Sequence, residues 1–428
     1  MSTESFPPQA ADLSQRFHDV SLRVIGPDGV AVTEGPFTVE QTRHAFGFGN
    51  IGFDFLELLA GPPAGADAGR VFGGADVAHG VQLLDAWLGL FDTVTLPFYW
   101  RGFEPEHGMP DTRRLQTTAR WFAEHGVRVK GHPLVWHTLA PEWLMPLSDA
   151  DVEAAIRDRI TREVTGFRGV IDLWDAINEV VILPVFTAED NAVTRLAQST
   201  GRVGMVRLAF ETARAANPAA RLVLNDFDLS EDYERLIEEC LDAGIHIDAI
   251  GLQTHMHQGY RGEERVWAIL ERFSRFGLPL QLTETTLLSG DLMPAHIVDL
   301  NDHIVDSWPS TAEGEARQAD ELVGHYRTVV AHPAVESLTY WGLTDEGSWL
   351  GAPSGLLRAD GTPKPAYAAL RELVRDEWWH SPRALEAGAN GAVRVRGFAG
   401  EYRVTTPVGA AAFAIEPGAE SIVVEVTA

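Results

Sequence analysis

Cysteine and basic residues are both scarce in this chain of 428 residues. Cys240 is the one cysteine, so no disulfide can form within the chain, which fits a reducing compartment. Lys and Arg together number 34 against 61 Asp and Glu, which gives a net charge of −27. Because so acidic a chain repels phosphate backbones and anionic lipid headgroups, we expect neither nucleic acid nor a membrane as a partner.

Long apolar runs are missing as well. No segment supplies the roughly 20 unbroken apolar residues that cross a bilayer. The start, "MSTESFPPQAADLSQRF", has no basic stretch followed by an apolar one, as an export signal would have. The expected location is therefore the cytoplasm. Hydrophobic residues still make up 45% of the chain, enough for one large domain with an appendage or for two ordinary domains.

Apolar runs of strand length alternate with segments of helical periodicity between about residue 42 and residue 375. The candidate strands are 44–50, 91–96, 127–132, 170–178, 221–226, 247–255, 278–284 and 335–343. Helical segments between them include 111–126, 203–218, 230–244 and 263–277. Eight such units predict an α/β fold, a (β/α)8 TIM barrel. The alternative is a doubly wound open sheet, but no Gly-x-Gly-x-x-Gly opens a helix to support a dinucleotide site.

The two ends of the chain have a different pattern. Residues 19–43 are typical of short strands joined by a Pro-Asp-Gly turn, and residues 391–428 alternate with period two between Gly-rich turns. Neither end is large enough to form a core alone. We therefore expect an N-terminal β segment (1–41) and a C-terminal β segment (379–428) to pack together as a small β-sandwich beside a barrel spanning 42–378.

Polar side chains at the carboxyl ends of the strands are the candidate functional residues, because (β/α)8 barrels carry their reactive groups there. These ends hold His132, Asn178, Glu179, Asn225, Asp226, Gln253, His255, Glu284 and Trp341. Apolar surroundings raise the pKa of a carboxyl group and suit it to act as an acid. Two carboxylates in unequal environments, Glu179 and Glu284, are the minimum apparatus for cleaving a glycosidic bond. Either one alone could be a satisfied buried acid, but the pair at matching barrel positions favours catalysis.

Six segments follow one another in a recognisable order. They are "HPLVWHTLAPEWL" (132–144), "WDAINE" (174–179), "LNDF" (224–227), "IGLQTH" (250–255), "LPLQLTE" (278–284) and "YWGLTDEGSW" (340–349), the last followed by "GTPKPAYAAL" (361–370). Together they resemble glycoside hydrolase family 10, the xylanase-type (β/α)8 glycosidases. The resemblance covers nearly all of residues 44–375.

The resemblance implies a role for each matched residue. Glu284 would be the nucleophile and Glu179 the general acid and base. Asn178 would hydrogen-bond the sugar 2-hydroxyl, and His255 would hold the nucleophile. The subsite at the cleavage point would be lined by His132, Trp136, Gln253, Trp341 and Trp349. Hydrolysis would proceed with retention, for which the two carboxyl groups lie roughly 5–5.5 Å apart.

The sequence departs from the family where the sugar beyond the cleavage subsite is bound. Family members usually carry a Glu-Asn pair and a Lys after the second strand, and an ungapped comparison places Thr95, Leu96 and Tyr99 there. The usual Asp two residues after the nucleophile is Thr286, and the usual Arg after the final Ser-Trp is Leu350. Losing hydrogen-bonding groups from a polar site changes which substrate is accepted. We therefore expect a β-linked glycoside or short oligosaccharide, rather than polymeric xylan, as the substrate.

Other functions stay open at this point. The same fold could cleave another linkage, in a furanoside or an aryl conjugate, because a fold does not dictate its substrate. A non-hydrolytic carbohydrate-binding protein could also retain the site, although the presence of both carboxylates counts against it. His255 and His257 could form a metal pair on one face of a strand. No further ligands accompany them in the sequence, so no metal or cofactor is expected. The sequence does not indicate an oligomeric state.

Overall fold

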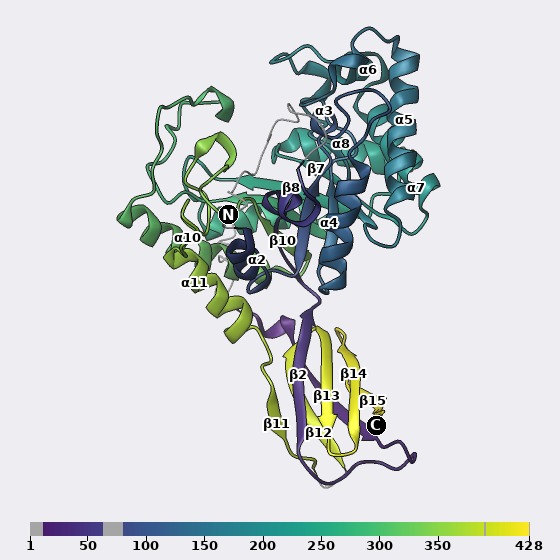
Figure 1. Cartoon of the computed structure of the whole chain (residues 1–428), viewed down its shortest axis with the longest axis vertical. Coiled ribbons are helices and arrows are strands. Elements are labelled where there is room, and N and C mark those ends of the chain that lie inside the picture. Colours follow the sequence, from purple (N-terminus) through teal and green to yellow (C-terminus); the bar gives the residue numbers. More distant parts are fainter. Residues whose placement is uncertain (1–11, 63–79, 389–390, 428) are drawn as a thin grey trace, which may run out of the picture.

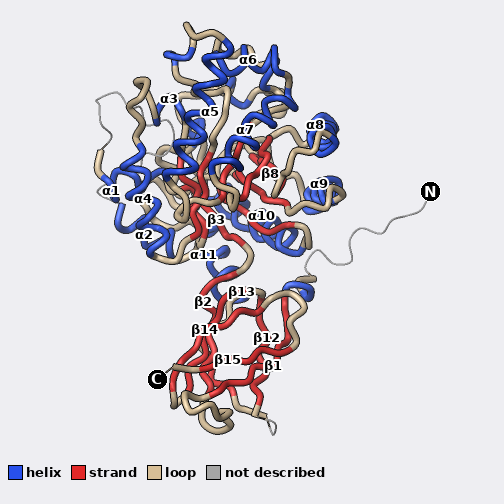
Figure 2. Tube along the Cα trace, turned by 90° about the vertical axis from the view of Figure 1, so that its right-hand side faces the viewer, coloured by secondary structure: helices blue, strands red, loops and turns tan. Residues whose placement is uncertain are grey.

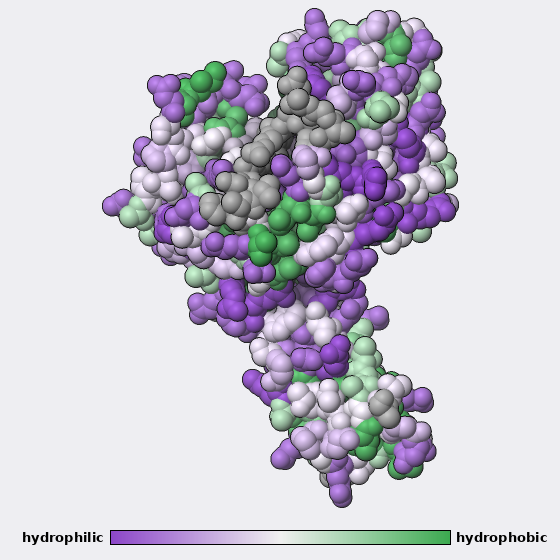
Figure 3. All heavy atoms as spheres, viewed as in Figure 1, coloured by the Kyte–Doolittle hydropathy of each residue, from purple (hydrophilic) through white to green (hydrophobic). Residues whose placement is uncertain are grey.

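The computed structural model describes residues 12–62, 80–388 and 391–427. Within these ranges a barrel surrounded by helices is joined through a narrow waist to a smaller module of strands (Figure 1). On the face drawn in Figure 3 the barrel is mostly hydrophilic, whereas the module mixes hydrophilic and hydrophobic residues. Among the residues that the structure describes, no helix combines the length and the apolar character that a bilayer span requires.

Eight strands close the barrel in the order β10-β3-β4-β5-β6-β7-β8-β9. Their bounds are β3 Gly47–Ile51, β4 Thr93–Pro97, β5 Arg128–His132, β6 Leu173–Asn178, β7 Arg221–Asp226, β8 Ala249–His255, β9 Leu280–Thr286 and β10 Val335–Tyr340. All neighbouring pairs are parallel. Each strand overlaps one predicted segment, so the (β/α)8 barrel is confirmed and the open-sheet alternative is excluded. The strands are buried on both faces, β9 along its whole length, which explains their nearly continuous apolar sequences.

Helices surround these strands. Their bounds are α1 Leu56–Ala60, α2 Gly80–Leu88, α3 Trp100–Phe103, α4 Thr112–Glu124, α5 Asp149–Gly166, α6 Ala192–Thr200, α7 Arg202–Ala216, α8 Glu231–Asp242, α9 Glu263–Ser274, α10 Ala312–Ala331 and α11 Pro365–Arg371. The four predicted helical segments correspond to α4, α7, α8 and α9. Side-chain oxygens begin several helices by accepting a first-turn backbone N–H, namely those of Ser148, Asn191, Ser230 and Thr311.

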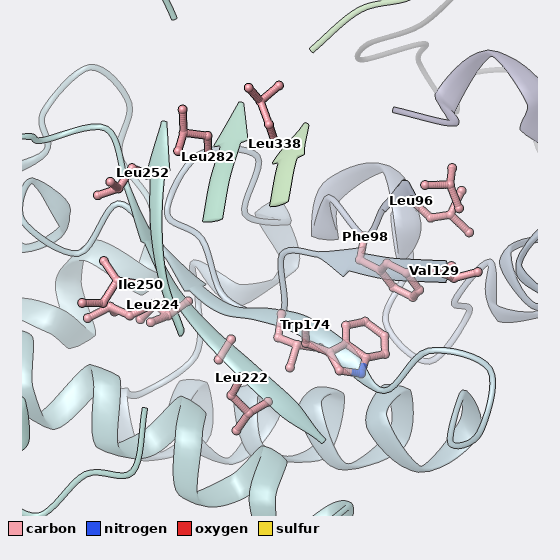
Figure 4. Packing of buried hydrophobic residues seen from close by; sticks show 14 of the residues in the cluster. Leu96, Phe98, Val129, Trp174, Leu222, Leu224, Ile250, Leu252, Leu282 and Leu338 are labelled. Atoms are coloured by element: carbon pink, nitrogen blue, oxygen red, sulfur yellow. The ribbon is translucent and has the colours of Figure 1, made fainter. Parts of the chain in front are cut away.

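The barrel core is filled by large apolar side chains (Figure 4). Trp174 on β6 is fully buried, and its indole ring lies against Gly131 on the neighbouring strand β5. A Cβ atom at position 131 would stand 2.2 Å from that ring, so only glycine leaves room for it. Leu96 on β4 is likewise fully buried in this core.

Strands from both ends of the chain form the module. β1 Phe17–Ile25, β12 Ala392–Phe398 and β15 Ser421–Glu425 make one sheet. The other contains β2 Phe37–His44, β11 Arg383–Leu385, β13 Gly400–Thr406 and β14 Gly409–Ile415. β1 pairs with both β12 and β15, and β2 pairs with β13, so each sheet combines N-terminal and C-terminal strands (Figure 2).

The two sheets of the module share a core of their own. Leu22 and Val395 from one sheet and Val39 and Tyr402 from the other belong to the same buried cluster. The β-sandwich made from the two chain ends is therefore confirmed. The expected boundary between residues 41 and 42 lies inside β2. The division of the chain into domains stays a prediction.

Aromatic residues and one arginine form the waist between module and barrel. Trp378 lies with its ring centroid 5.9 Å from that of Phe48 on β3 and 6.3 Å from that of Phe398 on β12. Arg16, at the end of the 3-10 helix η1 (Ser14–Arg16), donates to carbonyl oxygens at 2.5–2.8 Å, those of Val330, His332 and Val335. These contacts fall at the amino ends of the barrel strands. The carboxyl ends therefore face away from the module.

Candidate active site

All nine side chains predicted for the site lie at the carboxyl ends of the barrel strands or in the loops that follow. The strands supply His132, Asn178, Gln253, His255 and Glu284, and the loops supply Trp136, Glu179, Trp341 and Trp349. Hydrogen bonds and ring contacts join them into one cluster, so the structure brings the whole predicted set together. Their catalytic roles stay predictions at this point.

Glu179 follows the last residue of β6 and has a φ angle of 58°, in the left-handed region that few residues other than glycine adopt. Such a conformation costs on the order of 1 kcal/mol and persists only where neighbouring contacts hold it. The Glu179 backbone N–H donates to the carbonyl oxygen of Asn225 at 2.8 Å. Its carboxylate accepts from Trp136 Nε1 at 2.7 Å, Asn178 Nδ2 at 3.0 Å and Gln253 Nε2 at 3.3 Å. Three donors thus orient the carboxyl group at the rim.

Glu284, on β9, is held by a separate set of partners. Its Oε2 lies 3.2 Å from His255 Nε2, and its Oε1 accepts from Asn225 Nδ2 at 3.1 Å. Asn225 also donates to Asn178 Oδ1 at 2.7 Å and accepts from Thr283 Oγ1 at 2.6 Å. Both amide protons of Asn225 are therefore used. The two carboxylates are linked through the Asn178 and Asn225 amides.

The two carboxyl groups have different surroundings. Burial raises the pKa of Glu179 to about 8, and the negative charges of Glu284 and Asp226 act in the same direction. The hydrogen bonds from Trp136 and Gln253 oppose this rise because they favour the ionised form. Glu179 consequently holds its proton at neutral pH, as a general acid must. Glu284 accepts a hydrogen bond from the Asn225 amide and lies beside the His255 imidazole.

Two residues beneath His132 were not predicted from the sequence. Asp175 Oδ2 lies 2.8 Å from His132 Nδ1, and its other oxygen pairs with Lys130 Nζ at 2.8 Å. Burial by itself would raise the pKa of Asp175, but Lys130 and His132 outweigh it and hold the pKa below its usual value. An ionised Asp175 accepts the Nδ1 proton, so His132 Nε2 faces Glu284 Oε1, at 3.9 Å. Lys130 and His132 are two residues apart on one strand, so their side chains point to the same face. This spacing was the signal in the sequence that could have revealed the hydrogen-bonded row of Lys130, Asp175 and His132.

Tyr99 lies inside the site although the sequence comparison counted it only as a departure. Its ring centroid is 5.6 Å from that of His132 and 5.8 Å from that of Phe53, which in turn lies 5.7 Å from Trp341. Burial, followed by the charges of Glu284 and Glu179, raises the pKa of the phenol well above its usual value. Tyr99 therefore presents a neutral O–H within an aromatic wall.

The other positions that depart from the family fall in different places. Leu96 belongs to the barrel core rather than to the site, and Thr95 is also buried on β4. Thr286 contacts His255, with 3.2 Å between Oγ1 and Nδ1. Leu350 follows Trp349 and has a φ angle of 62°. Of the three departures after the second strand, Tyr99 therefore brings an aromatic ring to the site, whereas Leu96 lies in the barrel core.

His137, the second His of the 132–144 segment, also lies near Glu179, although the sequence assigned it no role in the site. Its Nε2 is 3.9 Å from Glu179 Oε2. Burial lowers the pKa of His137 to about 3, so the ring is neutral at physiological pH. Its place in "LVWH", one residue after Trp136, was the available signal.

The two histidines considered as a metal pair lie at this same end of the barrel. The rings of His255 and His257 are 5.9 Å apart between centroids. No group of three or more His, Cys, Asp or Glu within residues 12–62, 80–388 and 391–427 is arranged to hold a metal ion.

Residues 97–373 match the family described as Glycosyl hydrolase family 10. This chain belongs to glycosyl hydrolase family 10. Xylanases of this family are retaining glycosidases that use two carboxylates, and the chain is accordingly a glycosidase of that type.

Several curated relatives of this family 10 member are xylanases. Endo-1,4-beta-xylanase B of Thermotoga neapolitana is 27% identical over 296 residues, which cover 65% of this chain and 78% of the relative. Endo-1,4-beta-xylanase of Geobacillus stearothermophilus is 28% identical over 272 residues, which cover 57% and 76%. Xylanase 10B from Thermotoga petrophila RKU-1, solved in complex with xylobiose, has the same fold, with a TM-score of 0.59 and 22% identity over 78% of this chain and 95% of that one.

Proposed function

We propose that Glu284 is the nucleophile of this glycosidase and that Glu179 is its general acid and base. The difference in environment between the two carboxyl groups is the observation that carries this assignment. Glu179 is partly buried with a pKa near 8, whereas Glu284 accepts from the Asn225 amide and lies 3.2 Å from the His255 imidazole. One group is suited to supply a proton and the other to attack.

The reaction then follows two steps. Glu284 attacks the anomeric carbon while Glu179 gives its proton to the leaving glycosidic oxygen, which releases the aglycone and forms a glycosyl ester. Glu179, now ionised, takes a proton from water as the water oxygen attacks the anomeric carbon. This attack expels the Glu284 carboxylate and returns both groups to their starting states.

The remaining predicted residues would bind the sugar at the cleavage point. Asn178 would contact the 2-hydroxyl, and His255 would position Glu284. The sugar would lie against the residues that line this end of the barrel, namely His132, Trp136, Gln253, Trp341 and Trp349. Tyr99 joins this set as a neutral O–H donor because it lies beside His132.

The proposed substrate is a β-linked glycoside or short oligosaccharide, met in the cytoplasm, rather than polymeric xylan. The aromatic wall of Phe53, Tyr99 and Trp341 supports this choice, because Tyr99 puts a ring where family members usually carry a Lys. Rings with a single O–H bind a sugar face with few directional hydrogen bonds. Another linkage, as in a furanoside or aryl conjugate, is the second candidate, since the same wall would accept it.

A mechanism-based inhibitor tests the assignment of the nucleophile. An activated 2-deoxy-2-fluoro β-glycoside should form a stable ester with Glu284, detected by intact mass and peptide mapping. Glu284→Ala should not be labelled, whereas Glu271→Ala, which removes an exposed carboxylate on α9, should be labelled fully. Labelling of any other residue would overturn the assignment. Tight sugar binding with no labelling would instead favour a non-hydrolytic protein.

A substrate panel tests the second part of the proposal. Hydrolysis should be clear on short xylo-oligosaccharides or aryl β-glycosides, pyranosides and furanosides included, and low on polymeric xylan. Glu179→Ala and Glu284→Ala serve as background controls. Polymeric xylan as the best substrate would overturn the choice of a small glycoside. Cell fractionation of the natural host tests the cytoplasmic location.

A further inference from the structure

A line of four side chains runs from Glu284 into the protein. His255 Nε2 lies 3.2 Å from Glu284 Oε2, and His255 Nδ1 lies 3.2 Å from Thr286 Oγ1. Thr286 Oγ1 in turn lies 3.4 Å from His257 Nδ1. The backbone N–H of Met256 also points to this hydroxyl oxygen, at 3.4 Å. Thr286 is fully buried and His257 is 1% exposed, so the inner end of the line is shielded from bulk solvent.

The direction of these hydrogen bonds follows from the donors and acceptors available. An ionised Glu284 only accepts, so His255 must carry its proton on Nε2 to donate to it. A neutral His255 then has a bare Nδ1, which needs a donor. The Met256 N–H donates chiefly to the Thr286 carbonyl oxygen, at 3.0 Å, and more weakly to the hydroxyl oxygen, which leaves the hydroxyl proton for the bare Nδ1 of His255. The same oxygen accepts a second proton from His257 Nδ1.

The surroundings of His257 favour its neutral form. Trp349 packs against His255 and His257 with ring centroids 4.8 and 5.1 Å away, and Trp308 lies 6.3 Å from His257. Burial lowers the pKa of His257 to about 3, with smaller contributions from His255 and His303. Glu284 from β9 and His303 from the loop before α10 are the titratable groups that face this pair from the elements packed against it. His257 Nε2 has no hydrogen-bond partner among the described residues, so Nδ1 is the ring nitrogen that forms a hydrogen bond.

We propose that Thr286 and His257 are positioning residues that keep His255 neutral, with its proton on Nε2 and donated to Glu284. His257 then donates to Thr286, Thr286 donates to His255, and His255 donates to Glu284. This inference rests on the proposed role of Glu284. It also explains the departure at position 286, since an Asp there would accept the Nδ1 proton and require a charged His255 to serve both neighbours.

Histidine tautomers in the full-length protein test the proposal without reference to activity. In protein labelled with 15N-histidine, His255 should carry its proton on Nε2 and His257 on Nδ1 at neutral pH, with His255→Asn and His257→Asn used to assign the signals. A His255 proton on Nδ1 in the unaltered protein would overturn the proposal. The tautomer measurement needs no substrate, so its result does not depend on whether Glu284 reacts with the 2-fluoro glycoside. A failure of that glycoside to label Glu284 would refute the proposed function and not the proposed tautomers.

Position 286 allows a matched series for activity on an aryl β-glycoside. Thr286→Val removes the donor at equal size and should lower kcat/KM about tenfold, while Thr286→Ser should stay within about twofold of the unaltered enzyme. Thr286→Asp should make His255 charged and move the acid limb of the pH profile of kcat/KM to lower pH. An unchanged kcat/KM and pH profile in Thr286→Val would overturn the proposal. If Thr286→Val fails to fold, an activity of Thr286→Ser far below the unaltered level would do the same.

Discussion

Trp136 donates its indole N–H to Oε2 of Glu179 across 2.7 Å, and this bond opposes the effect of burial on the same carboxyl group. Burial favours the neutral acid, whereas a donor aimed at the carboxylate favours the ionised form. The pKa near 8 is the result of both. One side chain thus positions the acid and also sets the pH range in which it holds its proton.

Removing the indole N–H should therefore move the alkaline limb of activity. Trp136→Phe is expected to raise the pKa of Glu179, so that kcat/KM falls off at higher pH than in the unaltered enzyme. The pH dependence of kcat/KM on an aryl β-glycoside measures this. Trp143→Phe is the matched control, because Trp143 donates to the Glu104 carbonyl oxygen instead and should leave the limb in place. A limb that moves to lower pH in Trp136→Phe would contradict the stated balance.

Glu179→Gln should separate substrates by leaving group. The amide cannot give a proton to the departing oxygen, so kcat/KM should fall by about 10²–10⁴ on oligosaccharides, whose leaving groups are poor. Aryl β-glycosides with acidic phenols need little protonation and should lose far less in the first step. Steady-state rates over a series of phenols measure the difference. An equal loss across the series would argue against Glu179 as the acid.

The same substitution should change the pH dependence of stability. The unfolded chain releases the Glu179 proton near the ordinary pKa of 4.5, whereas the folded protein holds it to about 8. Raising the pH through this window therefore favours unfolding of the unaltered protein. Glu179→Gln lacks this penalty and should gain stability relative to it, by on the order of a few kcal/mol at pH 8 and by almost nothing at pH 4.5. Urea unfolding at pH 8 and at pH 4.5 measures the difference in the free energy of unfolding between Glu179→Gln and the unaltered protein. This difference should be larger at pH 8, and an equal difference at both pH values would contradict the prediction.

Arg16→Ala should weaken the waist without touching catalysis. The guanidinium donates to three carbonyl oxygens at the amino end of the barrel and packs 5.5 Å from the Phe46 ring centroid. Its loss should lower the free energy of unfolding by about 2 kcal/mol, with kcat unchanged. Arg23→Ala, on the same N-terminal segment but exposed, should change stability by less than about 0.5 kcal/mol. A fall in kcat with stability intact would show instead that the module influences the active site.

Much of the architecture could be predicted because it depends on local pattern. The eight barrel strands are short apolar runs separated by helical segments, and both properties are visible in neighbouring residues. Because (β/α)8 barrels carry their reactive groups at the carboxyl ends of the strands, those ends supplied the candidate residues. The structure places all of them at one end of the barrel. Tyr99 was the clearest gap. Its ring reaches the site through contacts with Phe53 and His132, which belong to other strands and loops and leave no mark near residue 99.

The sequence by itself determined which carboxyl groups stand at the rim, because strand periodicity and the Asn-Glu and Thr-Glu endings are properties of short segments. Only the tertiary structure decided how the two groups differ. The Trp136 bond to Glu179 spans 43 residues, and the Asn225 bond to Glu284 spans 59. Burial and nearby charges set a pKa, and both arise from groups that become neighbours only when the barrel closes.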